Sequence, residues 1–238
     1  MNKKIKNLAK KIVRPSMKVL RPLILQFFEL RIKFFKPTEE KQKKQVERWE
    51  KNGCPAPPPH FVKQNTITEY QQKYGYNILV ETGTYRGDMV EGQKRRFKKI
   101  ISIELGVELY KKAQKRFIND KNVVLVQGDS GKMLPGDSGK MLPGILKDIG
   151  EPAIFWLDGH YSEWVTAKGD KDCPIFEELD AIFDSKAFNH VLLIDDARTF
   201  DGEGDYPTVA ELAEYIKSKN EGYQVEVKHD IIRSAIPV

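Results

Sequence analysis

The residues of this chain that could do chemistry are acids that come directly after short apolar runs. The first is Glu81, which follows Ile-Leu-Val and opens a turn with the pattern Glu81-x-Gly83-x-x-x-Gly87. Glycines permit a tight turn and a close approach of the backbone to a ligand, and a helix after the turn would offer amide donors. Because an acid takes the first position, the turn is not the Gly-x-Gly-x-x-Gly dinucleotide fingerprint. A carboxylate there would repel a pyrophosphate and attract a cationic amino-acid group.

Two further apolar runs end in side chains that can bind a nucleoside. Glu104 stands 21 residues after Gly83, close to the interval of about 20 at which an acid binds ribose hydroxyls. Asp129 and Ser130 follow the third run, where we expect them to bond an adenine edge. One acid at such a place is usually a helix cap or a solvated residue. Three strand ends in sequential order after a glycine turn indicate a binding site for an adenosyl cofactor.

The fourth and fifth apolar runs end in Asp158 and in the pair Asp195–Asp196. Three carboxylates near one another repel unless they are protonated or share a cation. Oxygen-only ligands select Mg²⁺, Ca²⁺ or Mn²⁺, so we predict a metal site formed by these three acids. His160 is the best candidate for a general base, because a histidine ordinarily titrates near neutrality. Without a metal, Asp158 and His160 would still form an acid–base pair.

Alternating helices and strands must position these acids. The first five expected strands are near-continuous apolar runs, as in a parallel sheet that is covered on both faces. Strands that alternate with helices predict a doubly wound α/β domain with a mostly parallel seven-stranded sheet. In that architecture ligands bind beyond the carboxyl ends of the strands. Strands are expected at 77–82, 99–104, 122–127, 152–157, 190–195, 223–229 and 231–236, and helices at 66–74, 88–97, 107–118, 130–149, 173–184 and 208–219.

Residues 1–36 form a basic arm with eleven lysines and arginines and one acid, Glu29. The rest of the chain holds 29 basic and 33 acidic side chains, so the body is mildly acidic. Large apolar residues alternate with the basic ones at helical spacing, which suits an anionic membrane surface. The alternatives are a helix packed on the body or on a second subunit, and a nucleic-acid arm. Nucleic acid is the weaker alternative, because large apolar residues do not serve phosphate binding.

Charged residues interrupt every apolar run of the arm, so it predicts neither a signal peptide nor a transmembrane helix. Cys54 and Cys173 are far apart in the sequence and form no disulfide framework or zinc spacing, which fits a reducing compartment. We therefore expect a cytoplasmic protein with its arm on the inner membrane face. A charged helix at 38–52 and a proline-rich spacer at 54–60 lead to a division into an arm and linker, 1–60, and a catalytic domain, 61–238.

An eight-residue tandem copy interrupts the third strand–helix connection. The sequence GDSGKMLP occupies 128–135 and again 136–143. Insertions are best tolerated at such a connection, and the copy is too short for a solenoid repeat. Either Asp129 or Asp137 could take the ligand-facing position. We favour Asp129, because it directly follows the strand.

The glycine turn and the acids that follow it resemble the class I S-adenosylmethionine-dependent methyltransferases. The resemblance covers roughly residues 66–236 and includes the reversed final strand that is typical of that family. It implies that the turn lines the methionine portion of the cofactor and that the next two strand ends hold ribose and adenine. The residues concerned are Glu81, Gly83 and Gly87 for methionine, Glu104 for ribose, and Asp129 with Ser130 for adenine.

The later acids are similar to those of cation-dependent O-methyltransferases of the catechol and macrolide-sugar types. In those enzymes an acid after strand four and an acidic pair after strand five hold a metal that binds two substrate hydroxyls. Asp196 departs from the catechol type, which commonly has Asn there, and fits the sugar type. The resemblance implies metal-assisted deprotonation of an acceptor hydroxyl and in-line attack on the sulfonium methyl, which depends mostly on alignment.

These features together predict an S-adenosylmethionine-dependent O-methyltransferase for a glycan, a glycolipid or a small hydroxylated acceptor. The acceptor prediction rests on the arm and on the similarity to enzymes of surface-polysaccharide and secondary-metabolite pathways. A nicotinamide-dependent oxidoreductase is the alternative enzyme, although Glu81 and the missing second glycine argue against it. A catalytically silent scaffold at a membrane surface, which kept the cofactor fold, is the alternative that is not an enzyme.

Overall fold

The computed structural model describes residues 39–130, 142–147, 149–158, 173–185 and 188–238. It divides into two compact units, Met1–Glu47 and Arg48–Val238, and helix α3 (Glu39–Lys51) runs across the boundary. In the first unit Lys44 pairs with Glu40 at 2.6 Å, one helical turn apart. The linker residues from 48 onward belong to the second compact unit. The functional division of the chain at residue 60 stays a prediction.

Within the second unit, Trp49 packs the end of α3 against the spacer and the β6–β7 hairpin. Its side chain is buried, its Nε1 donates to the Pro55 carbonyl at 2.7 Å, and its ring meets the His229 ring edge-on with centroids 5.0 Å apart. Burying a side chain of this size stabilises a fold by roughly 2–3 kcal/mol. The proline-rich spacer is thus held against the body at its first residues.

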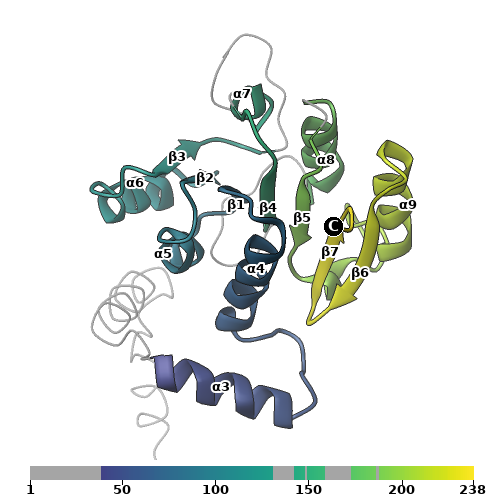
Figure 1. The fold of residues 1–238 in the computed structure, drawn as a ribbon, viewed down its shortest axis with the longest axis horizontal. Helices are drawn as coiled ribbons and strands as arrows, with labels where there is room; N and C mark the ends of the chain where they lie inside the picture. Colours follow the sequence, from purple (N-terminus) through teal and green to yellow (C-terminus); the bar gives the residue numbers. More distant parts are fainter. Residues whose placement is uncertain (1–38, 131–141, 148, 159–172, 186–187) are drawn as a thin grey trace, which may run out of the picture. The chain divides into compact units, whose positions relative to one another are not determined.

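Seven strands of the second unit form one sheet in the order β3-β2-β1-β4-β5-β7-β6 (Figure 1). The first five run parallel, whereas β7 is antiparallel to both β5 and β6. The strand order reverses between β1 and β4, and ligands bind at such a switch point. The strands are β1 (Ile78–Thr82), β2 (Lys99–Glu104), β3 (Val123–Gln127), β4 (Ala153–Leu157), β5 (Val191–Ile194), β6 (Gln224–Lys228) and β7 (Ile231–Ala235). The predicted doubly wound sheet with a reversed last strand is confirmed.

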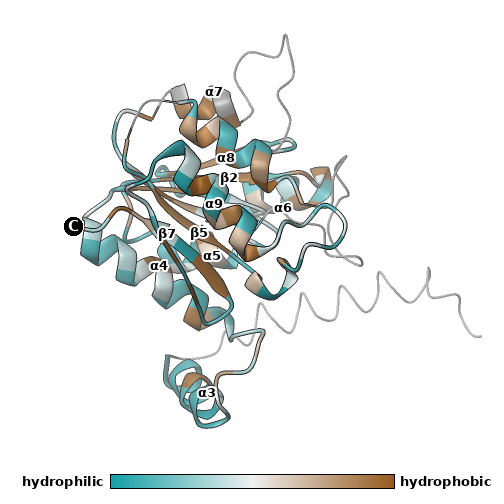
Figure 2. Cartoon of the chain, turned by 90° about the vertical axis from the view of Figure 1, so that its right-hand side faces the viewer, coloured by the Kyte–Doolittle hydropathy of each residue, from teal (hydrophilic) through white to brown (hydrophobic). Residues whose placement is uncertain are grey.

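Helices cover both faces of the sheet and leave its apolar strands between them (Figure 2). One layer comprises α4 (His60–Tyr74), α5 (Asp88–Gln93) and α6 (Val107–Arg116), and the other comprises α7 (Leu142–Lys147), α8 (Ile175–Phe183) and α9 (Val209–Lys219). A short 3₁₀ turn, η2 (Ala197–Thr199), follows β5. Within the part of the chain that is described, no helix combines the length and the apolar character needed to cross a bilayer.

Three predictions about individual elements need correction. The expectation that all five parallel strands are covered on both faces is wrong for β3, where Val124 is 41% exposed because β3 is the edge of the sheet. Helix α4 begins at His60 instead of 66, because Pro59 occupies its N-cap with a φ of −55° and leads directly into the helix. Helix α5 ends at Gln93 instead of 97. Of the helix expected at 130–149, the structure describes Leu142–Lys147 as helical, and 131–141 and 148 lie outside the described residues.

Candidate functional site

The turn after β1 needs both of its glycines. Gly83 and Gly87 have φ values of +86° and +75°, a conformation that costs other residues about 1 kcal/mol or more. A Cβ atom on Gly87 would also lie 2.5 Å from Cε2 of Phe117. The Gly83 amide donates to the Ile103 carbonyl at 2.9 Å, which holds the turn against the end of β2. The spacing read from the sequence therefore reflects a folded turn.

Glu104 fastens that turn to the next loop. Its Oε2 accepts from the Tyr85 amide and its Oε1 accepts from the Gly106 amide, both at 2.7 Å. The side chain is buried, which raises the pKa of the carboxyl, while the two backbone hydrogen bonds oppose that rise. Each carboxylate oxygen keeps a further lone pair, so Glu104 can still accept two hydroxyl donors. The predicted contact of Glu104 with ribose stays a prediction.

Glu81 lies in β1 just before the turn, and its side chain is buried. Burial raises the pKa of its carboxyl to about 8, against the opposing effect of the hydrogen bond from Ser102 on the neighbouring strand. The Ser102 hydroxyl also shares a hydrogen bond of 2.6 Å with Thr84 of the turn. A carboxyl in this state ionises readily only when a cation comes near. The predicted contact of Glu81 with the cationic end of a cofactor stays a prediction.

Asp129 and Ser130 follow β3 at the same edge of the sheet, and the Ser130 hydroxyl is already engaged. It donates to Oε1 of Glu178 on α8 at 2.5 Å. Glu178 is buried, which raises the pKa of its carboxyl to about 7, and it also bonds Thr82. The predicted contact of Asp129 and Ser130 with adenine stays a prediction. Sequence reasoning missed Glu178, since an acid in the first turn of a helix usually serves the helix itself.

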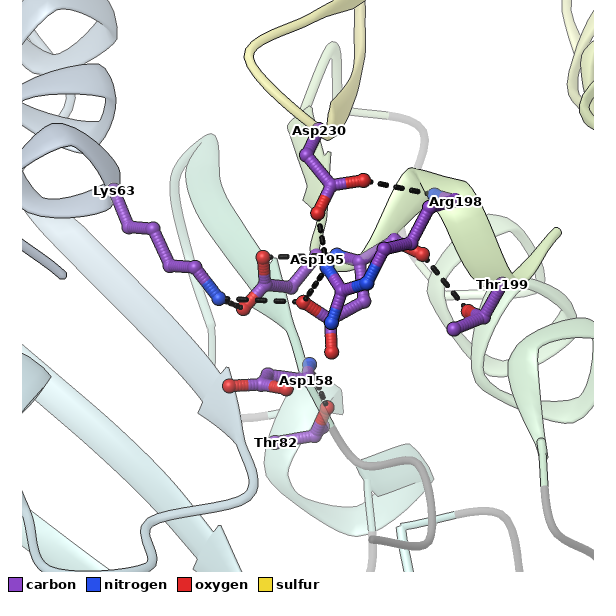
Figure 3. A network of polar contacts seen from close by, with 8 residues as sticks. Lys63, Thr82, Asp158, Asp195, Arg198, Thr199 and Asp230 are labelled. Atoms are coloured by element: carbon purple, nitrogen blue, oxygen red, sulfur yellow. Dashed lines mark hydrogen bonds and ion pairs between the residues drawn. The ribbon is translucent and has the colours of Figure 1, made fainter. Parts of the chain in front are cut away.

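The structure brings Asp158, Asp195 and Asp196 together beyond the ends of β4 and β5 (Figure 3). One oxygen from each carboxylate lies within 4.8 Å of the other two. Burial raises the pKa of the Asp158 carboxyl well above its usual range, and the negative charge of Asp195 raises it further. Burial likewise raises the pKa of Asp195, although Lys63 opposes the rise. The free-energy cost of ionising these carboxylates next to one another falls when a cation binds among them.

The backbone after β5 turns so that the carboxylates of Asp195 and Asp196 lie near that of Asp158. Asp196 has a φ of +55°, a left-handed conformation that Asp tolerates better than most residues. Its amide donates to Oδ1 of Asp195 at 2.8 Å, and its carbonyl accepts from the Thr199 hydroxyl at 2.8 Å. Strained residues of this kind cluster at functional sites. The conformation therefore supports a functional reading of the pair.

Two basic residues contact the cluster from opposite sides, and one of them, Lys63, was not predicted from the sequence (Figure 3). Lys63 of α4 donates to Oδ2 of Asp195 and lies 3.3 Å from Oδ1 of Asp196. Arg198 bonds Oδ1 of Asp196 at 2.9 Å and also bonds Asp230. The pKa of Lys63 is raised, because the lowering effect of its burial is outweighed by the carboxylates around it. The cluster thus contains its own counter-charges.

Asp230 reaches Arg198 through the hairpin between β6 and β7. His229 and Asp230 have φ values of +56° and +61°, as in the two-residue turns that match the twist of paired strands. The carboxylate of Asp230 also accepts from the Arg198 amide at 2.8 Å. The only signal for this contact in the sequence was an acid in a hairpin turn, which is an ordinary turn residue.

The donor set fits a hard divalent cation, since three carboxylates from two neighbouring strands supply oxygen ligands alone. The proposed general base, His160, and the alternative ligand-facing acid, Asp137, lie outside the described residues. Their roles therefore stay predictions.

No family model and no curated protein matches the sequence. In structure the chain is similar to the O-methyltransferase from Bacillus cereus in complex with SAH, with a TM-score of 0.51 and 15% identity over 87% of this chain and 96% of that one. It is also similar to a Staphylococcus aureus protein assigned as a caffeoyl-CoA O-methyltransferase, with a TM-score of 0.48 and 12% identity over 89% of this chain and 97% of that one. The chain has the Rossmann-like fold of class I S-adenosylmethionine-dependent methyltransferases, as the sequence predicted.

Proposed function

We propose that this protein is an S-adenosylmethionine-dependent O-methyltransferase that acts on a hydroxylated acceptor. The observation that carries the proposal is the position of the acidic cluster next to the glycine turn. The Asp158 amide donates to the Thr82 carbonyl at 3.2 Å, so the first acid of the cluster lies beside the last residue of β1. A cofactor over the turn and an acceptor over the cluster would therefore meet at one edge of the sheet.

The cofactor half of the proposed site consists of Glu81, Gly83, Gly87, Glu104, Asp129 and Ser130. When bound there, S-adenosylmethionine would supply an electrophilic methyl group. Glu104 accepts the ribose hydroxyls, and its two backbone hydrogen bonds keep it oriented before the ligand arrives. Glu81, nearly uncharged in the free protein because of its burial, becomes ionised beside the cationic end of the cofactor.

The acceptor half consists of Asp158, Asp195 and Asp196, with His160 as the proposed base. A divalent cation held by the three carboxylates would lower the pKa of an acceptor hydroxyl. The residues themselves orient the acceptor, because the strand ends that carry them are fixed by the sheet. In the absence of a metal, Asp158 and His160 are the proposed acid–base pair, and burial raises the pKa of the Asp158 carboxyl toward its protonated form.

The first test is calorimetric titration of the purified protein with S-adenosylhomocysteine, with and without Mg²⁺. We expect micromolar binding, and transfer of labelled methyl groups to a polyhydroxylated acceptor in a subsequent screen. An Asp195→Ala variant should bind the product nucleoside as the wild type does and lose methyl transfer. Absence of binding in both conditions would contradict the proposal and favour the silent-scaffold alternative.

We propose further that the acceptor is a glycan or glycolipid at the cytoplasmic face of a membrane, reached through the basic arm of residues 1–36. The support is the composition of the arm, which combines eleven basic residues with many large apolar ones. Deleting residues 1–36 should release the protein from vesicles that contain anionic lipid while micromolar binding of S-adenosylhomocysteine persists. If the shortened protein still sediments with the vesicles, the arm is not the membrane contact.

A further inference from the structure

Lys63 lies in the first turns of α4, the helix that precedes the sheet. It shares a helix face with Ile67, one turn later, which is fully buried against the sheet. This packing directs the lysine toward the carboxyl ends of the central strands, as Figure 3 shows. The side chain of Lys63 is only 15% exposed, so its ammonium group is largely withdrawn from water.

The ammonium group bonds one oxygen of Asp195, and the loop bonds the other. Oδ1 of Asp195 accepts from the Asp196 amide at 2.8 Å and serves the loop itself. Oδ2 accepts from Lys63 Nζ, and the Asp195 side chain is 1% exposed. The same Nζ lies 3.3 Å from Oδ1 of Asp196. Lys63 therefore sits between the two acids of the pair.

A metal ion would require the same place. Carboxylate oxygens bind Mg²⁺ at about 2.1 Å and Ca²⁺ at about 2.3–2.6 Å, closer than the distance at which an oxygen accepts from an ammonium group. A divalent ion that reached Oδ2 of Asp195 would lie almost in contact with Nζ, and the two positive charges would repel strongly in a site with little water. The metal ion and the ammonium group would therefore compete for Asp195.

We propose that Lys63 is a resident cation that holds the Asp195–Asp196 pair in the metal-free protein and is displaced when a divalent cation binds. The inference rests on the metal site of the proposed function. The proposal gives α4 a role at the acceptor site, because this helix carries the lysine. Binding of the metal and release of the lysine from Asp195 are then one exchange reaction. The exchange makes metal binding weaker than three carboxylates alone would give.

The first measurement is the affinity of the full-length protein for Mn²⁺. Electron paramagnetic resonance reports the concentration of unbound Mn²⁺ during the titration. Lys63→Met removes the competing cation and should tighten Mn²⁺ binding by about tenfold or more. Lys63→Arg keeps the charge and should bind Mn²⁺ as weakly as the wild type. Binding of S-adenosylhomocysteine by each variant reports that it is folded.

A second measurement separates displacement from a simple effect of charge. An amine-reactive ester labels lysines at rates that rise when the ammonium group loses its partners, and mass spectrometry reads each site. Mn²⁺ should raise the labelling rate of Lys63 several-fold and leave that of Lys73 unchanged. Lys73 is an exposed lysine on the same helix, so it is the matched internal control.

The outcomes are distinguishable. Equal Mn²⁺ affinity for the wild type and Lys63→Met, with an unchanged labelling rate of Lys63, would overturn the exchange and leave the metal site intact. Tighter binding by Lys63→Met with no change in labelling would also overturn it, because the lysine then acts only through its charge. If no variant binds Mn²⁺ while S-adenosylhomocysteine still binds, both the exchange and the metal part of the proposed function fail, and the methyltransferase proposal stands.

Discussion

The two halves of the candidate site handle their carboxylates in opposite ways. In the cofactor half, Glu81 and Glu104 bond uncharged groups, which are a hydroxyl and two backbone amides, and the neighbouring Glu178 bonds the Ser130 hydroxyl. In the acceptor half the carboxylates crowd together, and the groups that bond Asp195 and Asp196 include the charged side chains of Lys63 and Arg198.

This difference indicates what each half is prepared to receive. Fixed amide donors orient an acceptor oxygen before binding and need no rearrangement when a ligand arrives. Lysine and arginine side chains are flexible counter-charges that can be replaced by another cation. The hydrogen-bond donors of the cofactor half are thus fixed before a ligand binds. In the acceptor half, the charged side chains that neutralise the carboxylates can be replaced by another cation.

The sharpest way to break this comparison is to remove the orienting carboxylate of the cofactor half. Glu104→Ala leaves two backbone amides without an acceptor and deletes the proposed ribose contact. We expect the dissociation constant of S-adenosylhomocysteine to rise by about 100-fold or more, which corresponds to roughly 2.7 kcal/mol. Calorimetry measures this loss, and Glu108→Ala is the control, because the Glu108 side chain is 80% exposed. Binding within threefold of the wild type in Glu104→Ala would show that the half is not prearranged by this residue.

A second prediction concerns the stability of the turn itself. Gly87 and Gly75 have nearly the same φ, +75° and +70°, but only a Cβ on Gly87 would meet Phe117, whereas one on Gly75 would meet open space. Gly75→Ala should cost about 1 kcal/mol of unfolding free energy, and Gly87→Ala about 2–3 kcal/mol. Urea denaturation measures both. Adding Phe117→Leu should recover part of the loss only in the Gly87→Ala background, and equal losses for the two single variants would contradict tight packing of the turn.

A third prediction uses the protonation of Glu81. Its pKa is raised from 4.5 in the unfolded chain to about 8 by burial, so the folded state holds a proton that the unfolded state releases between these values. Its contribution to stability is complete below pH 4.5 and is lost as the pH rises toward 8, with a slope of at most about 1.4 kcal/mol per pH unit. Other buried acids add their own slopes, so the comparison must be made with Glu81→Gln. We expect a shallower loss of stability between pH 5 and 8 in the variant, measured by urea denaturation, and identical slopes would contradict the assignment.

The rigid parts of this structure were the ones that could be predicted from the sequence. Near-continuous apolar runs specified the five parallel strands, and the residue after each run identified the strand ends where the candidate site lies. Asp158, Asp195 and Asp196 were placed together for the same reason, because parallel strands end at one edge of the sheet. Local patterns were sufficient wherever one strand end determined the position of one side chain.

Contacts between distant elements could not be predicted. Lys63 was not predicted as a site residue, because the prolines before it favour an extended spacer. Its spacing to Ile67 is nevertheless helical. Glu178 has the sequence signature of an ordinary helix acid, and its partners Ser130 and Thr82 lie after β3 and at the end of β1. The exposure of β3 depends on which strand takes the edge of the sheet, which is a property of the strand order. Each of these features required the tertiary arrangement.

The last and smallest predicted effect sharpens the comparison in the acceptor half. Arg198 is 40% exposed, so water screens its pairing with Asp196 and Asp230, and such a pair contributes little to stability. In Arg198→Gln the backbone amide of residue 198 still donates to Asp230, which therefore keeps a partner at the end of the hairpin. We expect a loss below about 1 kcal/mol in urea denaturation and an unchanged affinity for S-adenosylhomocysteine. A loss as large as that of Gly87→Ala would mean that Arg198 is a fixed structural contact, and the acceptor half would then be no more exchangeable than the cofactor half.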